Sequence, residues 1–199
     1  MKYVVWMVLL AVQFGTAQTP SYLEEIKKHR QELNKHFKDK KSSPLPKKKI
    51  KNFIGLPFFP VDEKYKVKAK MTYTFNAPIQ YIANTDGKTE AYQQYAVATF
   101  KIDDKQCTLY IYQSLNLMKQ KGFENYLFIP FSDNSNGKST YGSGRYLDTT
   151  IPAEPTGYIT LDFNKAYNPY CAYNEKYVCP IPPKNNHLDL EIRAGVKYK

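Results

Sequence analysis

Hydrophobic residues change their spacing once along the chain, and the first spacing is helical. From Tyr22 to Phe37, apolar side chains recur every three to four residues, which predicts an amphipathic helix. Ser21 with Glu24 three residues later forms a capping-box pattern, so we expect the helix to begin at Tyr22. It ends near Lys38, because the prolines that follow push the residues before them out of helical dihedrals.

From Tyr65 onward the period is two. Apolar residues from Tyr65 to Phe75 alternate with Lys and Thr, the pattern of a strand with one face in water. Similar stretches, separated by turns such as Asp86-Gly87, follow at 79–83, 92–102, 107–112, 126–131, 157–163 and 188–192. We therefore predict a mainly β fold: an antiparallel β-sandwich or a barrel-like sheet of about seven strands, with one N-terminal amphipathic helix packed outside it.

The first 17 residues have the pattern of a signal peptide. Lys2 precedes the apolar run 3–12, and Gly15-Thr16-Ala17 is a small-x-small site that a signal peptidase accepts. We expect cleavage after Ala17 and export to the periplasm or the extracellular space. The alternative is an uncleaved anchor, but the run is shorter than the roughly 20 residues of a spanning helix, so we expect no stable membrane insertion after cleavage.

Charge divides the rest of the chain into two parts. The whole sequence carries a net charge of +11, and residues 24–51 hold 11 basic residues against four acidic ones. We predict a signal peptide at 1–17, a helix with a basic linker at 18–51, and a β domain at 52–199. The basic linker has no interleaved aromatic residues for base stacking, so we expect no nucleic-acid partner.

Most standard chemistries lack the residues they need. Only three His are present, and His29 and His36, which we expect to be exposed, lie two helical turns apart, so we predict no metal site. Gly137-Lys138-Ser139 lacks the first Gly of a phosphate-binding loop, and no Gly-rich nucleotide motif occurs elsewhere. We predict no cofactor.

Two segments are specific enough to suggest a family. The first runs from Phe131 through Asp133 to Gly-Ser-Gly-Arg-Tyr-Leu at 142–147, and the second is Leu-Asp-Phe-Asn-Lys-Ala-Tyr-Asn-Pro at 161–169. They resemble the bacterial and archaeal domain of unknown function family numbered 1684, over nearly the whole mature chain. This sequence departs from the usual pattern at Tyr170, where a second Pro is expected, and at Val196, where a Glu often follows Ala-Gly. The resemblance implies a family but no established activity.

These segments, with the second one continued to Asn185, hold a set of polar residues among Gly, Pro and aromatic residues. One interpretation is that they line a pocket for a small polar or anionic ligand. The other is that their hydrogen bonds hold the long loops against the sheet. The candidates are Asp133, Thr140, Tyr141, Arg145, Asp162, Asn164, Asn168 and Asn185. A third hypothesis is a hydrolase with Asp133 or Asp162 as general base.

Arg145 is the centre of this set. Arg is almost never fully buried without a partner, and the two nearby glycines bring backbone close to it. We predict that it pairs with Asp162 or Asp133. Whether the chain is an enzyme is left open by the sequence.

Cys171 and Cys179 bracket a tyrosine-rich loop. In an oxidising compartment they are close enough in sequence to form a disulfide, with Cys107 left alone in a strand. The alternative is two free thiols that pack as small apolar side chains.

Overall fold

The computed structural model describes residues 21–198. The predicted signal peptide, residues 1–17, therefore lies outside the described residues. The helices are α1 (Tyr22–Lys38) and the short α2 (Lys47–Ile50). The strands are β1 (Lys66–Tyr73), β2 (Gln80–Ala83), β3 (Thr89–Ile102), β4 (Lys105–Ser114), β5 (Tyr126–Asp133), β6 (Arg145–Thr150), β7 (Tyr158–Asp162) and β8 (His187–Leu188). Single turns of 3-10 helix lie at 63–65, 117–119, 163–165, 170–172 and 184–186.

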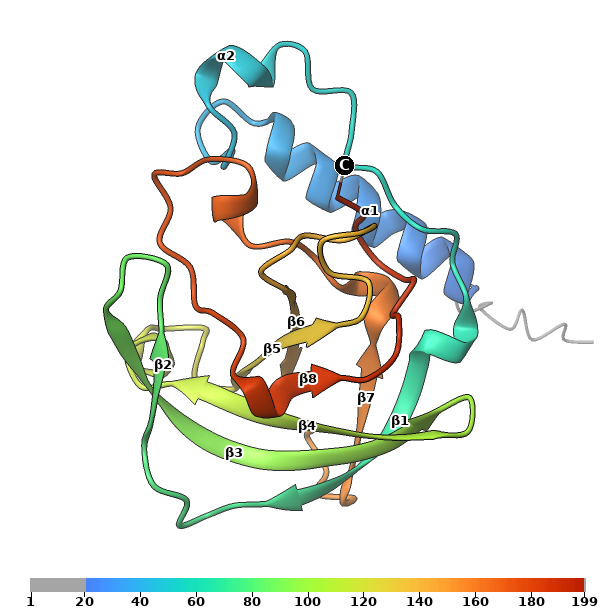
Figure 1. Cartoon of the computed structure of the whole chain (residues 1–199), viewed down its shortest axis with the longest axis vertical. Helices are drawn as coiled ribbons and strands as arrows, with labels where there is room; N and C mark the ends of the chain where they lie inside the picture. The colour runs from blue at the N-terminus through green and yellow to red at the C-terminus, as the bar shows by residue number, and fades with distance from the viewer. Residues whose placement is uncertain (1–20, 199) are drawn as a thin grey trace, which may run out of the picture.

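Eight strands form a curled sheet, a half-barrel, in the order β6-β5-β4-β3-β1-β7. β2 extends the sheet beside β3, and β8 pairs with β5 as a parallel strand. The mainly β prediction with an N-terminal helix is confirmed, in its barrel-like form. Figure 1 shows the long strands β3 and β4 curving beneath β8, with α1 crossing the opposite end of the molecule.

Every strand except β2 contributes apolar side chains to a shared inner core. Leu127 and Ile129 of β5 pack inward with Leu109 and Ile111 of β4, and all four are fully buried. The opposite face of β3–β6 carries a second buried cluster, which we call the outer aromatic cluster: Ile82, Tyr92, Tyr112, Phe128, Tyr146 and Cys179. A bulge between Gln94 and Ala96 lets β3 contribute Tyr92 outward and Ala96 inward.

α1 follows its predicted bounds and is tied to the sheet by its apolar face. The Ser21 side chain accepts a hydrogen bond from the Glu24 N–H, as the capping box predicts. Ile26 and Phe37 are buried, and Phe37 packs with Leu45, Ile50, Leu56 and Val196. The helix is therefore part of the folded body.

Two strand predictions differ from the structure. The segment 145–150 is not among the predicted strands, yet it forms all of β6. The predicted strand at 188–192 shrinks to the two residues of β8, because the Ile192 N–H binds the Asp133 carboxylate (3.1 Å) in place of a neighbouring strand.

Candidate functional site

The predicted polar residues fall into separate interior groups, and the first is built on a buried ion pair. Arg145, the first residue of β6, donates from Nη2 to Asp133 Oδ2 at 2.8 Å, with both side chains fully buried. It also donates to the carbonyls of Ile192 (2.7 Å) and Ala194 (2.6 Å). Burial lowers the pKa of Arg145, and the nearby Asp133 opposes that shift. Asp133, one of the two predicted partners, is therefore the one that Arg145 binds.

The rest of this group closes the 133–145 loop. Asp133 Oδ1 accepts from the Ser135 and Ile192 N–H groups, so the carboxylate is surrounded by donors. The Thr140 hydroxyl is buried against Ser135 Oγ at 2.7 Å. Tyr141 lies apart and half-buried, with its hydroxyl near Cys171 Sγ. The environment of Asp133 fits an anchor of the loop.

Asp162 and Asn164 form the second group. Asp162 Oδ1 accepts from the Tyr22 hydroxyl (2.9 Å) and the Asn164 N–H (3.0 Å), and it makes no ion pair with Arg145. The Asn164 side chain binds both the N–H and the carbonyl of Asp62. These contacts fasten α1 and the 60–65 turn to the end of β7.

The two remaining asparagines lie elsewhere. Asn168 is buried and donates to the Tyr173 hydroxyl and the Lys197 carbonyl. Asn185 is exposed, whereas its neighbour Asn186 is fully buried and bridges Tyr110 to Pro130. The structure thus brings Asp133, Thr140 and Arg145 together, and Asp162 with Asn164, but does not gather the eight residues around one pocket.

Cys171 and Cys179 are neighbours in space and both are free thiols in the structure. The Cys171 N–H donates to Cys179 Sγ at 3.2 Å. Burial, followed by the contact with Cys171, raises the pKa of Cys179 to about 12. The thiol of Cys179 is therefore a poor nucleophile at neutral pH.

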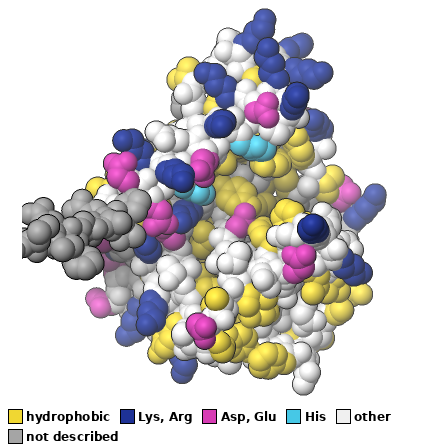
Figure 2. All heavy atoms as spheres, turned by 180° about the vertical axis from the view of Figure 1, so that it is seen from behind, with side chains coloured by type: hydrophobic (Ala, Val, Ile, Leu, Met, Phe, Trp, Pro, Cys, Tyr) yellow, Lys and Arg dark blue, Asp and Glu magenta, His cyan; other side chains and the backbone are white. Residues whose placement is uncertain are grey.

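A cavity with a largely apolar lining lies beside the outer aromatic cluster, between the sheet, α1 and the 167–180 loop. It measures about 520 Å³, within the usual range for small-molecule sites. Figure 2 shows it as a hollow floored by hydrophobic side chains below the helix. Most of its lining is aromatic or aliphatic, including Tyr92, Tyr126, Phe128, Tyr146, Tyr167, Tyr170, Tyr177, Val178 and Pro180.

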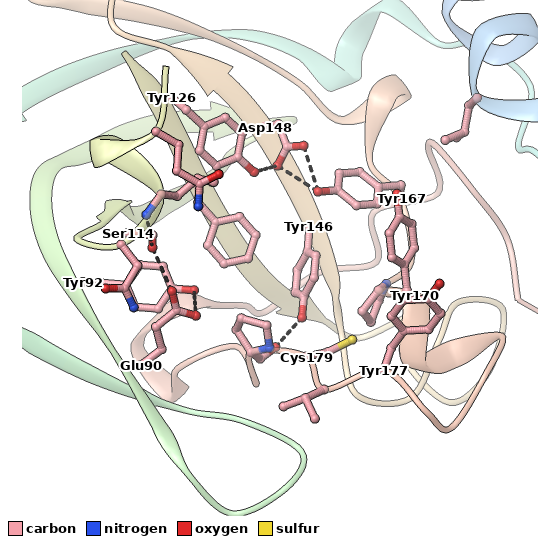
Figure 3. A pocket seen from close by; sticks show the side chains of 18 of the residues that line it. Glu90, Tyr92, Ser114, Tyr126, Tyr146, Asp148, Tyr167, Tyr170, Tyr177 and Cys179 are labelled. Atoms are coloured by element: carbon pink, nitrogen blue, oxygen red, sulfur yellow. Dashed lines mark hydrogen bonds between the residues drawn. The ribbon is translucent and has the colours of Figure 1, made fainter. Parts of the chain in front are cut away.

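One carboxylate at this cavity is Asp148 of β6, held by two tyrosines. Its Oδ1 accepts from the Tyr126 hydroxyl at 2.7 Å, and the Tyr167 hydroxyl lies 2.9 Å from Oδ1 and 2.8 Å from Oδ2 (Figure 3). The Asp148 side chain is exposed to water in the cavity, and the protein atoms around it displace part of its hydration. This desolvation raises the pKa of Asp148, while the two tyrosine hydroxyls oppose the rise.

Glu90 of β3 is the second carboxylate and is held in the same manner. It accepts from the Tyr92 hydroxyl at 3.1 Å and from the Ser114 hydroxyl at 2.8 Å. Figure 3 shows Glu90 and Asp148 at different sides of the cavity. Burial raises the pKa of Tyr92, with Glu90 adding to the shift, so this hydroxyl stays protonated and keeps donating.

The cavity carries no strong positive charge. Among residues 21–198, no Lys or Arg lines it, although the whole chain has a net charge of +11. His29 of α1 lines it and is half-buried, contrary to the expectation that it is exposed; burial lowers its pKa. His36, also expected to be exposed, is half-buried with Nε2 3.0 Å from the Tyr170 hydroxyl.

Sequence reasoning missed Asp148, although a signal for it exists. In a strand, Arg145 and Leu147 point to one face and Tyr146 and Asp148 to the other. Reading 145–150 as a strand would have placed Asp148 beside Tyr146, away from the core that holds Arg145. No sequence pattern shows the distant partners Tyr126 and Tyr167.

Comparison with known proteins defines the class of the chain. Residues 51–197 match the family described as "Protein of unknown function (DUF1684)", so the chain belongs to this family. A relative with a solution NMR structure is the uncharacterized protein from gene locus rrnAC0354 of Haloarcula marismortui. The two sequences are 29% identical, and the alignment covers 89% of this chain and 94% of the relative. The two structures superpose with a TM-score of 0.69. No curated protein matches the chain.

Proposed function

We propose that this protein is a binding module whose ligand is a small organic cation with an apolar body, held in the tyrosine-lined cavity. The observation that carries the proposal is the pairing of two carboxylates, Asp148 and Glu90, with aromatic walls and no Lys or Arg among the lining residues of the described chain. Aromatic rings attract cations through their negative faces, and a carboxylate adds direct charge pairing.

Folding alone does not require a carboxylate at position 148. The hydrogen bonds of Tyr126 and Tyr167 to Asp148 face the cavity, and water that enters it can satisfy tyrosine hydroxyls equally well. Partial desolvation of the Asp148 carboxylate raises the free energy of the folded protein, and ionisable groups in such environments are concentrated at functional sites. A bound ammonium group would offset the cost by pairing with the carboxylate.

The test uses three probes with the same apolar chain: pentylamine, pentanol and pentanoate, titrated by calorimetry. We expect the amine to bind and the alcohol and carboxylate to bind at least about tenfold more weakly, the value of one charge-assisted hydrogen bond. Asp148→Asn keeps the shape and removes the preference for the amine. Asp104→Asn, in an exposed turn, is the matched control and leaves binding unchanged. Equal binding of all three probes would refute the proposal.

A second candidate function is proton transfer by Asp148, because a carboxyl with a raised pKa facing a cavity has the properties of a general base. It differs from the hydrolase hypothesis on Asp133 and Asp162. Both oxygens of Asp133 accept hydrogen bonds from the donors described above. Asp162 Oδ1 accepts from Tyr22 and Asn164, and Asp162 Oδ2 has no hydrogen-bond partner within residues 21–198. A panel of small esters tests it: turnover that Asp148→Asn abolishes supports catalysis, and binding of pentylamine without any turnover supports the binding module.

The proposal places the module outside the cytoplasm. Its support is the signal-peptide pattern of residues 1–17.

A further inference from the structure

A second feature, at and beyond the C-terminal end of α1, is a dense set of lysines. We call it the lysine patch: Lys38, Lys40, Lys41, Lys47, Lys48, Lys49 and Lys51. Asp39 is the single acidic residue between positions 38 and 51, so these fourteen residues carry +6 of the chain's +11. All seven lysines are exposed.

The charges of the patch are not neutralised by the protein. Within residues 21–198, none of the seven lysines takes part in an ion pair, whereas other lysines, such as Lys165 with Glu25, do. Asp39 is occupied by the Lys41 N–H and the Ser42 hydroxyl. The patch therefore presents a strong positive field to solvent.

The segment that carries the lysine patch is packed against the folded protein. Phe37, Leu45 and Ile50 beneath it are buried in one cluster, and the Asn174 side chain donates to the Pro44 carbonyl. Figure 2 shows the lysines gathered at the end of the molecule where Figure 1 places α2. A fixed array loses little conformational entropy on binding, apart from that of the lysine side chains.

The shape and neighbours of the patch indicate the partner. Lys38, Lys40, Lys47 and Lys51 surround a surface hollow of about 470 Å³, with Ile50 at its base. Ile54, three residues beyond Lys51, is completely exposed. Lysines that converge around a hollow suit phosphate groups, and an exposed Ile beside them suits the apolar boundary of a bilayer.

We propose that the lysine patch docks the folded protein onto the surface of an anionic lipid bilayer, with Ile54 entering the headgroup boundary. This is peripheral binding. No helix in the described part of the chain combines the length and the apolar character that crossing a bilayer requires. The proposal does not depend on the cation cavity, which none of these seven lysines lines.

The experiment is sedimentation of the full mature chain with vesicles of phosphatidylcholine, alone or with phosphatidylglycerol as one lipid in three. We expect binding only to the anionic vesicles, and weaker binding at high salt. Replacing Lys47, Lys48 and Lys49 together by Gln should weaken it about 100-fold, since each lysine near an anionic leaflet contributes roughly a fivefold gain. Ile54→Ser should lower the binding that persists at high salt.

The control is the triple replacement of Lys68, Lys70 and Lys101 by Gln, which removes the same net charge from exposed positions on the sheet. We expect its vesicle binding to fall less than tenfold, and thermal unfolding to be similar for both triple variants. Equal losses for the two triples would show that net charge alone acts and would overturn the proposal. Binding to phosphatidylcholine alone, or tighter binding to double-stranded DNA than to anionic vesicles, would also overturn it.

Discussion

Removing Arg145 should destabilise the protein more than any single change at its surface. Arg145→Ala leaves the Asp133 carboxylate buried without its counter-ion and leaves the carbonyls of Ile192 and Ala194 without a donor. Loss of one partner of a buried ion pair costs about 3–5 kcal/mol, whereas an exposed pair is worth about 1 kcal/mol or less. Since both side chains are fully buried, we expect a loss of about 4 kcal/mol or more in the free energy of unfolding.

The assay is urea denaturation followed by circular dichroism, with a double-mutant cycle. Asp133→Ala should cost a similar amount, because it also leaves the Ser135 and Ile192 N–H groups unpaired. Arg145→Ala combined with Asp133→Ala should cost about 2 kcal/mol less than the sum of the single changes, since neither charge is then left alone. Asp162→Asn is the control and should show no coupling with Arg145, which it does not contact. A loss below about 1 kcal/mol for Arg145→Ala, or no coupling with Asp133, would refute the reasoning.

Four further predictions follow from other features. The pKa of Asp148 is raised in the folded state, so above the ordinary Asp pKa of about 3.9 the folded protein binds more protons at this group than the unfolded chain does. The contribution of Asp148 to the free energy of unfolding therefore falls as the pH rises through that window. In urea titrations over a pH series, Asp148→Asn should remove this fall, and parallel pH profiles for the two proteins would contradict the prediction. Gly195→Ala should lose more than about 2 kcal/mol in thermal unfolding, because φ is +73° and an added Cβ would meet the carbonyl oxygens of Ala166 and Phe163; unchanged stability would count against it. Peptide mapping of the exported protein without reductant should find a disulfide between Cys171 and Cys179. This bond closes a nine-residue loop and adds roughly 2.5 kcal/mol to the free energy of unfolding by the chain-entropy relation. Two free thiols in the exported protein would refute the prediction. Intact mass of the exported chain should match a first residue of Gln18, and retention of Met1 would exclude cleavage after Ala17.

The helix and most strands could be predicted because their signals are local. α1 has a capping box and an apolar face, and β1 alternates strictly between buried and exposed residues. The end of the chain alternates in the same manner at Leu188, Leu190 and Ile192, yet its backbone binds the Asp133–Arg145 pair instead of a strand. Side chains that take the backbone hydrogen bonds of a would-be strand leave no periodic pattern in the sequence.

The candidate site could be predicted less well, for a related reason. Among the polar residues of the Gly-rich and Pro-rich segments, Arg145 pairs with Asp133, which is one of the two partners that the sequence analysis predicts. The cavity, however, is assembled from distant segments: Glu90 and Asp148 come from different strands, and Tyr167 comes from the loop after β7. Such a site is defined by the curvature of the sheet, which the strand pattern does not specify.

The strand order has a consequence for self-association. β6 and β7 are the two ends of the half-barrel, and hydrogen-bonding edges of this kind are templates onto which a second chain can add a strand. Glu25 of α1 lines one cleft with Leu147 and Thr149 of β6 and Thr160 of β7, so the first turns of the helix lie over the seam between the two edges. α1 therefore covers part of this seam, and a chain lacking residues 21–38 would open the seam, and the apolar surface beneath Ile26 and Phe37, to a second copy of the chain.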